Sequence, residues 1–337
     1  MKYNVAVVGA TGNVGTSMLS ILAERNFPIA NIYAIASRSS LGKEISFGEE
    51  RILKIQSLDN FDFSGVDIAL FSPGSAVSSK YAPIAAAAGC VVIDNTSYFR
   101  MNHNIPLIIP EINGNQIQFY KKRNIIANPN CAVIGLLMAL KPLHDLVAIK
   151  RVVVATYQSV SGAGKQGMEE LFEQTKGILT YKKMNTQKFS RQIAFNLIPQ
   201  IDSFEQNGFT KEENKIRDET KKILSSDIEV VATCVRVPVF IGHSVAVNIE
   251  FCDQISVKEA IKSLKKMPGV VIVESLESFN TPAECAGEDA VYVSRVREDY
   301  SVKNGLCLWV VFDNIKKGAA LNAVQIAELL IKNYLKK

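Results

Sequence analysis

The chain has 337 residues, a length that favours two domains over one core. Hydrophobic residues make up 47% and charged residues 21%, which is typical of a folded globular protein and excludes a long disordered region. The net charge of +5 is spread along the chain, so we expect no nucleic-acid partner.

The first third of the chain alternates short β-branched runs with helical segments. A helix is predicted after Gly15, and the alanine-rich residues 80–88 predict another, capped by Gly89. Such alternation is typical of a parallel, doubly wound sheet. The predicted strands are residues 4–8, 32–37, 68–71 and 90–94.

After about residue 130 the predicted strands are longer and more alternating, which favours a mixed, largely antiparallel sheet with helices on one face. Residues 318–335 then carry apolar side chains at helical spacing and predict a final helix. The strands expected here are residues 151–158, 229–237, 244–251, 269–273 and 306–312.

The chain has no apolar run of the roughly 18–20 residues that a membrane helix needs. Its N-terminal apolar run is also too short for a signal peptide. The six cysteines include no C-x-x-C pair, and three histidines do not favour a metal site. We therefore expect a cytoplasmic protein with reduced thiols, no bound metal and no membrane partner.

A glycine-rich turn follows the first predicted strand. Gly9, Gly12 and Gly15 give a G-x-x-G-x-x-G pattern between a strand and a helix. In that context the amides at the helix start can approach a pyrophosphate closely. The pattern predicts dinucleotide binding, with a purely structural turn as the alternative.

The end of the second predicted strand bears on which dinucleotide is bound. A site that prefers NAD usually has Asp or Glu there, whereas this chain has Arg38 followed by Ser39. An arginine flanked by hydroxyls can bind a 2′-phosphate, which a carboxylate would repel. We therefore predict NADP(H); the alternative is a solvent-exposed loop arginine.

Cys131 follows Asn128-Pro129-Asn130 and lies in the first turn of a predicted helix, which Pro142 limits downstream. Asn130 can cap this helix, and the exposed amides and the helix dipole stabilise a thiolate at such a position. A buried structural cysteine is the alternative. None of the other five cysteines has comparable surroundings, so Cys131 is the candidate nucleophile.

Polar side chains also stand beside two glycine-containing loops. Gln158 ends a predicted strand that opens into the small-residue loop 161–164, where it could hydrogen-bond a substrate. Arg236 suits bidentate carboxylate binding. His243, expected in the loop after Gly242, titrates near neutrality and is the best general-base candidate of the three histidines. Structural roles are the alternative for each.

A charged helix is predicted from residue 211 towards residue 224. Glu212 and Lys215 lie at i and i+3 and share one face of it. By itself such a pair is usually a solvated ion pair.

Together these motifs resemble the bacterial type of the aspartate-semialdehyde dehydrogenase family, from Val5 to about Leu330. Their order and spacing agree as well. The resemblance rests on residues 9–15, on Asp94-Asn95-Thr96-Ser97-Tyr98-Phe99-Arg100, on Asn128-Pro129-Asn130-Cys131, on residues 161–164, on Arg236 and His243, and on residues 313–322.

The resemblance implies a Rossmann-like, NADP-binding α/β domain made of residues 1–129 and 315–337. Residues 130–314 would form an α+β catalytic and dimerisation domain with the mixed sheet, giving a homodimer. Thus the last helix would return to the first domain.

The family's residue roles carry over where the motifs match. Cys131 would be the acyl-thioester nucleophile and His243 the acid/base. The substrate-binding residues would be Gln158, Arg236, Glu212 and Asn130, and the phosphate ligands Arg100 and Lys215. The cofactor contacts would be Gly9, Thr11, Gly12, Asn13, Val14, Arg38, Ser39, Ser161, Gly162 and Asn314.

The implied reaction is L-aspartate 4-semialdehyde + phosphate + NADP+ ⇌ 4-phospho-L-aspartate + NADPH, a step that feeds lysine (through diaminopimelate), threonine and methionine synthesis. Cys131 would attack the aldehyde, His243 would take the hemithioacetal proton, and phosphate would cleave the thioester.

One departure concerns the helix start. The family usually has Ser or Thr and then Thr after the cysteine, where this chain has Ala132-Val133; we expect a perturbed rate or affinity with the chemistry intact. Two alternatives are an N-acetyl-glutamyl-phosphate reductase, whose cysteine typically sits in Asn-Pro-Gly-Cys, and a catalytically silent homologue that binds nucleotide.

Overall fold

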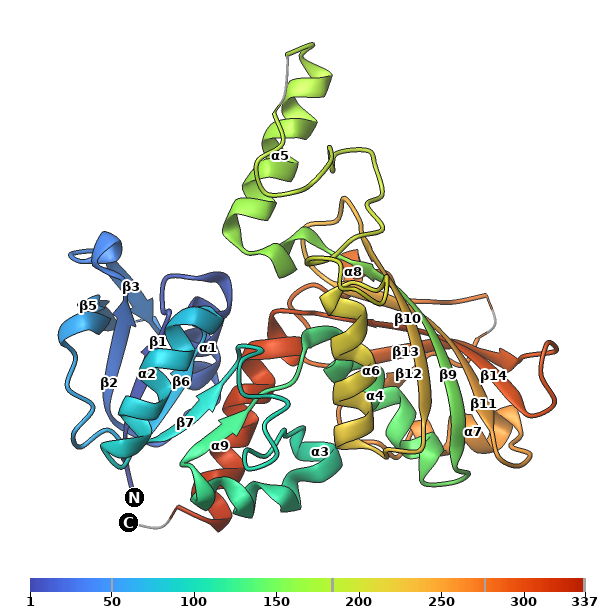
Figure 1. The fold of residues 1–337 in the computed structure, drawn as a ribbon, viewed down its shortest axis with the longest axis horizontal. Coiled ribbons are helices and arrows are strands. Elements are labelled where there is room, and N and C mark those ends of the chain that lie inside the picture. Colours follow the sequence, from blue (N-terminus) through green and yellow to red (C-terminus); the bar gives the residue numbers. More distant parts are fainter. Residues whose placement is uncertain (50, 183–184, 276, 336–337) are drawn as a thin grey trace. The chain divides into compact units, whose positions relative to one another are not determined.

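The computed structural model describes residues 1–49, 51–182, 185–275 and 277–335, which form two compact units (Figure 1). The first unit is Met1–Asn130 with Ala319–Lys337, and the second is Cys131–Gly318. The unit boundaries thus follow residues 130 and 318, where the family resemblance implied boundaries after residues 129 and 314. Residues 336–337 of the last predicted range lie outside the described residues.

The first unit is built on a six-stranded sheet in which every pairing is parallel. Strand order reverses on either side of β1, so the carboxyl ends of β1 and β2 meet at one edge. This confirms the predicted doubly wound sheet. The strands in spatial order are β5 (Gln56–Ser57), β2 (Ile29–Ala36), β1 (Tyr3–Val8), β6 (Ile68–Phe71), β7 (Val91–Asp94) and β8 (Ile125–Ala127).

Helices cover this sheet. α1 (Asn13–Glu24) packs against α9 (Leu321–Asn333), and both share one apolar core with β1 and β6. α2 (Ser75–Ala87) lies against β6 and β7 (Figure 1). The unit also contains a hairpin of β3 (Glu44–Phe47) and β4 (Arg51–Lys54), the 3-10 turns Arg38–Ser40, Leu58–Asn60 and Gly114–Lys122, and α3 (Pro110–Asn113).

The second unit contains a mixed six-stranded sheet. Its outer pairs, β10 with β9 and β12 with β13, are parallel, and the three inner pairings are antiparallel. The predicted mixed, largely antiparallel sheet is therefore confirmed. In spatial order the strands are β10 (Glu229–Arg236), β9 (Ile149–Gln158), β11 (His243–Phe251), β14 (Gly305–Phe312), β13 (Val291–Glu298) and β12 (Val270–Ile272).

Three helices pack on one face of this sheet: α4 (Cys131–His144), α6 (Lys211–Ile223) and α7 (Val257–Leu264). The other face is open within the chain, since Val153 and Ala155 of β9 stay half-buried and Tyr157 is exposed. α5 (Lys165–Leu179) packs separately, with the 3-10 turn Val160–Ala163 and residues 193–198. α8 (Pro282–Cys285) completes the unit.

Two local expectations differ from the structure. α4 runs through Pro142 and ends at His144, because Pro142 lies in the last turn and interrupts little of the helix. His243 was expected in a loop but is the first residue of β11; the preceding Gly242 makes the turn with a φ of 95°. Within the described residues, no helix combines the length and apolar character that a membrane crossing would require.

Candidate active site

The second unit places Cys131 at the first residue of α4, at the positive end of the helix dipole. All six cysteines are free thiols, and the Cys131 side chain is partly accessible. Burial raises the pKa of Cys90 and Cys234, and raises that of Cys285 to about 12. Those three thiols are therefore poor nucleophiles near neutral pH.

The imidazole of His243 faces this thiol. Cys131 Sγ lies 3.4 Å from His243 Nε2, although the two residues are 112 positions apart. β11 begins at His243 and lies in the sheet that α4 covers, so two regular elements fix the two side chains. A cysteine and an imidazole at this distance can act as nucleophile and acid/base partner.

The imidazole is uncharged at neutral pH. His243 is fully buried. Burial lowers the pKa of His243 to about 3, with the positive charge of Arg236 as the second cause. Glu212 opposes this shift without reversing it.

A chain of hydrogen bonds leads from the end of β9 to α6. The Gln158 amide nitrogen donates to Glu212 Oε1 at 3.1 Å, and Lys215 Nζ donates to Glu212 Oε2 at 3.2 Å. Gln158 and Glu212 are buried, so the pair at i and i+3 is not the solvated ion pair of the alternative interpretation. Lys215 also contacts Asp202, at 2.9 Å.

Arg236, the last residue of β10, is buried and donates from Nη1 to the Ser159 carbonyl at 2.7 Å. Burial is the main cause of the lowered pKa of Arg236, and Glu212 partly offsets it. The guanidinium thus brings a fixed positive charge to the wall of the site, suited to a carboxylate.

Two glycines border these groups. A Cβ at Gly162 would lie 3.0 Å from Arg236 Nη1 and 3.4 Å from His243 Cε1, and one at Gly318 would lie 3.1 Å from the Cys131 Cβ. Both positions exclude larger side chains from the surroundings of the thiol. Sequence reasoning assigned Gly162 to the cofactor and gave Gly318 no role.

Ser159 and Asn314 form a network behind the imidazole. The Ser159 backbone N–H and Oγ each lie 3.1 Å from His243 Nδ1. The Asn314 side-chain oxygen accepts from Ser159 Oγ, Ser161 Oγ and the Gly242 N–H. Ser161 and Asn314, predicted as cofactor contacts, are thus buried next to the histidine. The role of Ser159 was missed, although it directly follows Gln158.

In the first unit, close packing explains the glycine turn. A Cβ at Gly9 would lie 2.6 Å from the Ser72 carbonyl oxygen, and one at Gly15 would lie 2.2 Å from the Gly9 carbonyl oxygen. Gly12 is the N-cap of α1 and provides no side chain to its first amides. Asn13 and Val14 begin that helix, so residues 12–14 present backbone at its N-terminus, as a pyrophosphate site requires.

Arg38 and Ser39 lie in the turn after β2, and Thr11 in the glycine turn approaches the same place, 3.4 Å from Ser40. The Arg38 side chain is 74% exposed and forms an ion pair of 3.4 Å with Asp59. An ion pair this exposed contributes little stability, and another anion can replace Asp59 as the partner of Arg38. These residues therefore fit the phosphates of a dinucleotide.

Arg100 is buried and donates to the backbone carbonyls of Asn128, at 2.9 Å, and Asn95, at 2.7 Å. It thereby fixes the segment that leads to Asn130 and Cys131. Asn130 is also buried, directly before the thiol in sequence. The structure places Arg100 and Lys215 in different units.

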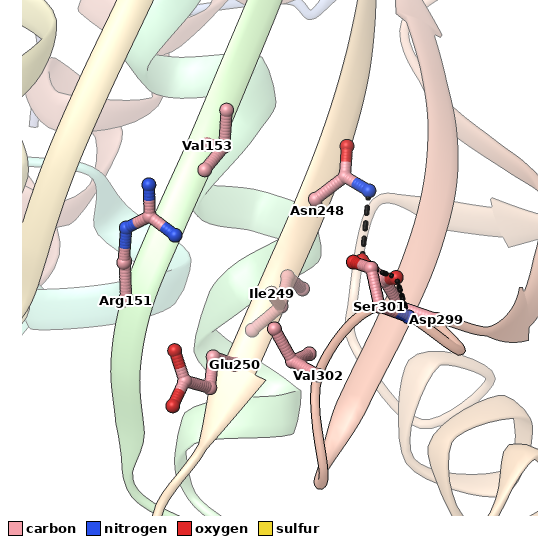
Figure 2. A pocket seen from close by; sticks show the side chains of 8 residues that line it. All are labelled: Arg151, Val153, Asn248, Ile249, Glu250, Asp299, Ser301 and Val302. Carbon is pink, nitrogen blue, oxygen red and sulfur yellow. Dashed lines mark hydrogen bonds between the residues drawn. The ribbon is translucent and has the colours of Figure 1, made fainter.

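A hollow of about 230 Å³ lies on the open face of the second sheet and contains none of these residues (Figure 2). Its lining includes Arg151, Glu250 and Asp299. Ser301 and Asn248 hydrogen-bond the Asp299 carboxylate and lower its pKa to about 2. With no nucleophile or histidine in its lining, this hollow does not provide the chemistry described above.

Two family models cover most of the chain. Residues 4–120 match the NAD binding domain of semialdehyde dehydrogenases, and residues 140–317 match the semialdehyde dehydrogenase dimerisation domain. The two matches correspond to the parallel and the mixed sheet.

Full-length relatives carry the same description. The chain is 53% identical to aspartate-semialdehyde dehydrogenase of Rickettsia bellii, with 99% of each chain covered. It is 50% identical to the crystal structure of aspartate semialdehyde dehydrogenase II complexed with ASA from Vibrio cholerae, with 99% and 100% covered and a TM-score of 0.97. The enzyme with NADP from Candida albicans, at 23% identity and a TM-score of 0.76, shares the fold.

Proposed function

Because the chain belongs to the aspartate-semialdehyde dehydrogenase family, we propose that it interconverts L-aspartate 4-semialdehyde and 4-phospho-L-aspartate through a thioester on Cys131, with NADP(H) and phosphate. The family makes the protein an NAD(P)-binding oxidoreductase of aspartate-family amino-acid biosynthesis. One observation carries the mechanistic proposal: Cys131 Sγ lies 3.4 Å from His243 Nε2, and Arg236 borders Gly162 together with His243.

The thiol supplies the covalent step. The Cys131 sulfur, as thiolate, attacks the aldehyde carbon, and His243 acts as the acid/base on the hemithioacetal oxygen. Bound NADP+ supplies the hydride acceptor. Phosphate oxygen then attacks the thioester carbon, forming the acyl phosphate and releasing the Cys131 thiolate. Covalent capture divides one difficult displacement into two easier ones.

Three buried groups would orient the substrate. Arg236 would bind the α-carboxylate through its planar donors. Glu212 would attract the substrate's α-ammonium group, while Gln158, which is hydrogen-bonded to Glu212, would hold the carboxylate or carbonyl. Because these groups come from β10, α6 and β9, regular structure fixes their spacing. Asn130 would assist from the residue before the nucleophile.

Lys215 and Arg100 are the proposed phosphate ligands. Lys215 lies on α6 one turn after Glu212, so one helix would bind both the amino-acid substrate and phosphate. Arg100 is held by backbone carbonyls close in sequence to Cys131. A permanent and a titratable cation together suit an inorganic anion.

The cofactor would be held by the glycine turn with Thr11, Gly12, Asn13 and Val14. Arg38 and Ser39 would hold the 2′-phosphate, and Ser161, Gly162 and Asn314 the nicotinamide end. The exposed Arg38 guanidinium supports NADP, and a 2′-phosphate bound there would have to displace the Asp59 carboxylate that Arg38 now pairs with. The second unit would form the homodimer through its open sheet face, which exposes Tyr157 beside Trp309.

The first prediction concerns the nucleophile. Cys131→Ser should reduce phosphate-dependent NADPH formation from aspartate semialdehyde by more than the 10²–10⁴-fold typical of losing an acid/base group. Cys252→Ser, at the most exposed of the other thiols, is the control and should keep full activity. Trapped acyl enzyme should appear on Cys131 by mass spectrometry. Near-normal activity of Cys131→Ser would rule out the covalent route.

The second prediction concerns the cofactor. Arg38→Ala should raise the KM for NADP+ by about 10- to 100-fold, the value of one charge-assisted hydrogen bond, and should leave the KM for NAD+ nearly unchanged. Arg25→Ala, which removes an ion pair with Glu328 at the opposite end of α1, is the control. A wild-type enzyme that prefers NAD+ by kcat/KM would contradict the NADP assignment.

The sequence motifs left one other enzyme activity open, that of an N-acetyl-glutamyl-phosphate reductase. The full-length relatives argue against it, and Asn130 stands where that enzyme typically has glycine. Supplying both acyl phosphates to the purified protein separates the two activities directly.

A further inference from the structure

The two nitrogens of the His243 ring face different kinds of atoms. Nε2 faces the Cys131 sulfur at 3.4 Å and the Gln158 amide nitrogen at 3.5 Å. Nδ1 lies 3.1 Å from the backbone nitrogen of Ser159, which the geometry makes a hydrogen-bond donor to it. The side chain is fully buried, so water does not compete for either nitrogen.

The backbone donor on the Nδ1 side indicates where the imidazole proton lies; Ser159 Oγ, also 3.1 Å from Nδ1, donates to Asn314 Oδ1 at 3.0 Å and leaves the N–H as the donor to the ring. A backbone N–H can only donate, so Nδ1 must present its lone pair to Ser159. A neutral imidazole carries one proton, and that proton then lies on Nε2. Among the described residues, the Gln158 amide nitrogen is the donor that opposes this assignment, but its contact is longer by 0.4 Å and it already donates to Glu212 at 3.1 Å.

The position of Ser159 is itself fixed. Arg236 donates to its carbonyl at 2.7 Å, and its hydroxyl lies 3.0 Å from both Ser161 Oγ and Asn314 Oδ1. With its carbonyl and hydroxyl both engaged, the residue cannot turn its N–H away from Nδ1 without breaking these bonds.

We propose that Ser159 is a positioning residue whose backbone N–H holds neutral His243 with its proton on Nε2, so that the resting imidazole donates a hydrogen bond to the Cys131 sulfur. The resting pair is therefore not a thiolate–imidazolium ion pair. A second proton would enter at Nδ1, directly opposite the Ser159 N–H. The proposal rests on the proposed function only for the role of Cys131, and it narrows the acid/base role of His243 to that of a hydrogen-bond donor at the start of the reaction.

The charges around the ring agree with this state. The groups that face His243 are Cys131 from α4, Arg236 from β10 and Glu212 from α6, with uncharged Gln158 and Ser159 beside them. The cation of Arg236 opposes a second positive charge on the ring, and the carboxylate of Glu212 is shared with Lys215. A neutral donor is the state that these neighbours favour.

The same tautomer suits the first chemical step. As the thiolate sulfur bonds to the aldehyde carbon, the C=O π pair moves to the oxygen, which Nε2–H can then stabilise by a hydrogen bond. When hydride leaves that carbon with its electron pair, the oxygen's negative charge re-forms the C=O bond. The thiol proton leaves to solvent before the attack, so the thioester forms with charge balanced and no net proton transfer to His243.

The test observes the ring nitrogens directly in the free enzyme, without substrate or cofactor. Protein labelled with ¹⁵N-histidine gives only three ring spin systems, from His103, His144 and His243, and each is assigned by its loss in a His→Gln variant. Long-range ¹H–¹⁵N spectra between pH 5 and 8 should place His243 Nδ1 at the resonance of an unprotonated nitrogen and Nε2 at that of an N–H. A protonated Nδ1, alone or together with Nε2, overturns the proposal.

The chain contains a matched control. Nδ1 of His144 also accepts a backbone N–H, from Ile149 at 3.0 Å, so His144 should show the same pattern. Ser159→Ala removes the hydroxyl but keeps the N–H, and it should leave the His243 pattern unchanged. If Ser159→Ala moves the proton to Nδ1, the hydroxyl and not the backbone fixes the tautomer, and the proposal fails.

A second measurement covers the thiol. The rate of Cys131 alkylation by iodoacetamide, followed by peptide mass spectrometry, should rise with pH in a single ionisation step. An ion pair would instead keep Cys131 reactive at acid pH and add a second step when the imidazolium ionises. Because neither experiment measures dehydrogenase activity, the proposal and the proposed function can fail separately.

Discussion

At the scale of single residues, the site depends on keeping an imidazole uncharged next to a permanent cation. Gly162, which has no side chain, allows Arg236 and His243 to approach the same space, where a Cβ would contact both. Arg236 and His243 can share this wall only because His243 remains neutral. A substrate carboxylate would then meet one positive charge, on Arg236, without competition from a second.

The third prediction concerns how the stability of the folded protein depends on pH, and it follows from the neutral state of His243. The pKa of His243 is about 3 in the folded protein, lowered first by burial, and near 6.5 in an unfolded chain. As pH falls below about 6.5, the unfolded chain binds a proton that the folded protein does not, so the contribution of His243 to stability is complete above that pH and declines towards pH 3. His243→Gln removes this dependence.

The melting temperature of the wild type should therefore exceed that of His243→Gln by more at pH 7.5 than at pH 5. Taking the difference between variants cancels the titration of all other groups to first order. Differential scanning fluorimetry at the two pH values measures it. A difference in melting temperature between the two proteins that is the same at both pH values, or larger at pH 5, would show that the folded protein accommodates the charged imidazole.

Single residues differed in how far the sequence could predict them. Cys131 and Arg38 could be proposed from the sequence because their signals are local: a helix start after Asn-Pro-Asn and a strand end after a glycine turn. Ser159 was missed because its role lies in a backbone N–H, which every non-proline residue has. Only the tertiary pairing of β9 with β11 brings that N–H to His243.

At the scale of elements, α4 packs closely against β14, the strand that pairs with the His243 strand β11, because the helix has a glycine at the point of contact. Gly135 lies one turn after Cys131 on α4, and a Cβ there would lie 2.1 to 2.5 Å from the ring of Phe312, the last residue of β14. The Phe312 ring in turn packs edge-on to His243, with centroids 6.0 Å apart. The buried Phe312 ring thus lies between Gly135 of α4 and the imidazole of His243.

The fourth prediction tests this spacer. Gly135→Ala should destabilise the protein by about 1–3 kcal/mol, the usual cost of overpacking a core, and should lower kcat by displacing His243 through Phe312. Phe312→Leu in the same chain should relieve much of both effects, because the smaller side chain leaves room for the added methyl. A double-mutant cycle in urea unfolding and in kcat measures the coupling. Additive effects would show that Gly135 and Phe312 act independently.

Prediction at the element scale succeeded where the apolar pattern was strong. β7 is four consecutive buried residues and was found, as was the periodic C-terminal helix. β13 was missed for a physical reason: its second half carries Arg295 and Arg297, and its pairing with β14 shifts register after Ser294. The positive φ of Arg295, 54°, belongs to that bulge, which breaks the alternation expected of a strand.

At the scale of the whole molecule, the chain returns to its first unit after completing the second. α9 contributes Val324, Ala327 and Leu330 to the core beneath β1 and β6, and Tyr3 hydrogen-bonds the Leu335 carbonyl at 2.8 Å. The nucleotide-binding unit therefore requires the last residues of the sequence to complete its core. The sequence pattern predicted the helix, but only the family resemblance indicated where it would pack.

The fifth prediction follows from this discontinuous core. Val324→Asp would bury an unpaired carboxylate in the first unit and should destabilise that unit by on the order of 4 kcal/mol. Asn333→Asp, an exposed position on the same helix, is the control and should have little effect. Hydrogen exchange followed by mass spectrometry should show faster exchange in peptides from residues 1–130 and retained protection in β9, β11 and β14. Since those peptides lie at least 190 positions before residue 324, a local change around α9 alone could not produce that pattern, and unchanged exchange in residues 1–130 would disprove the shared core.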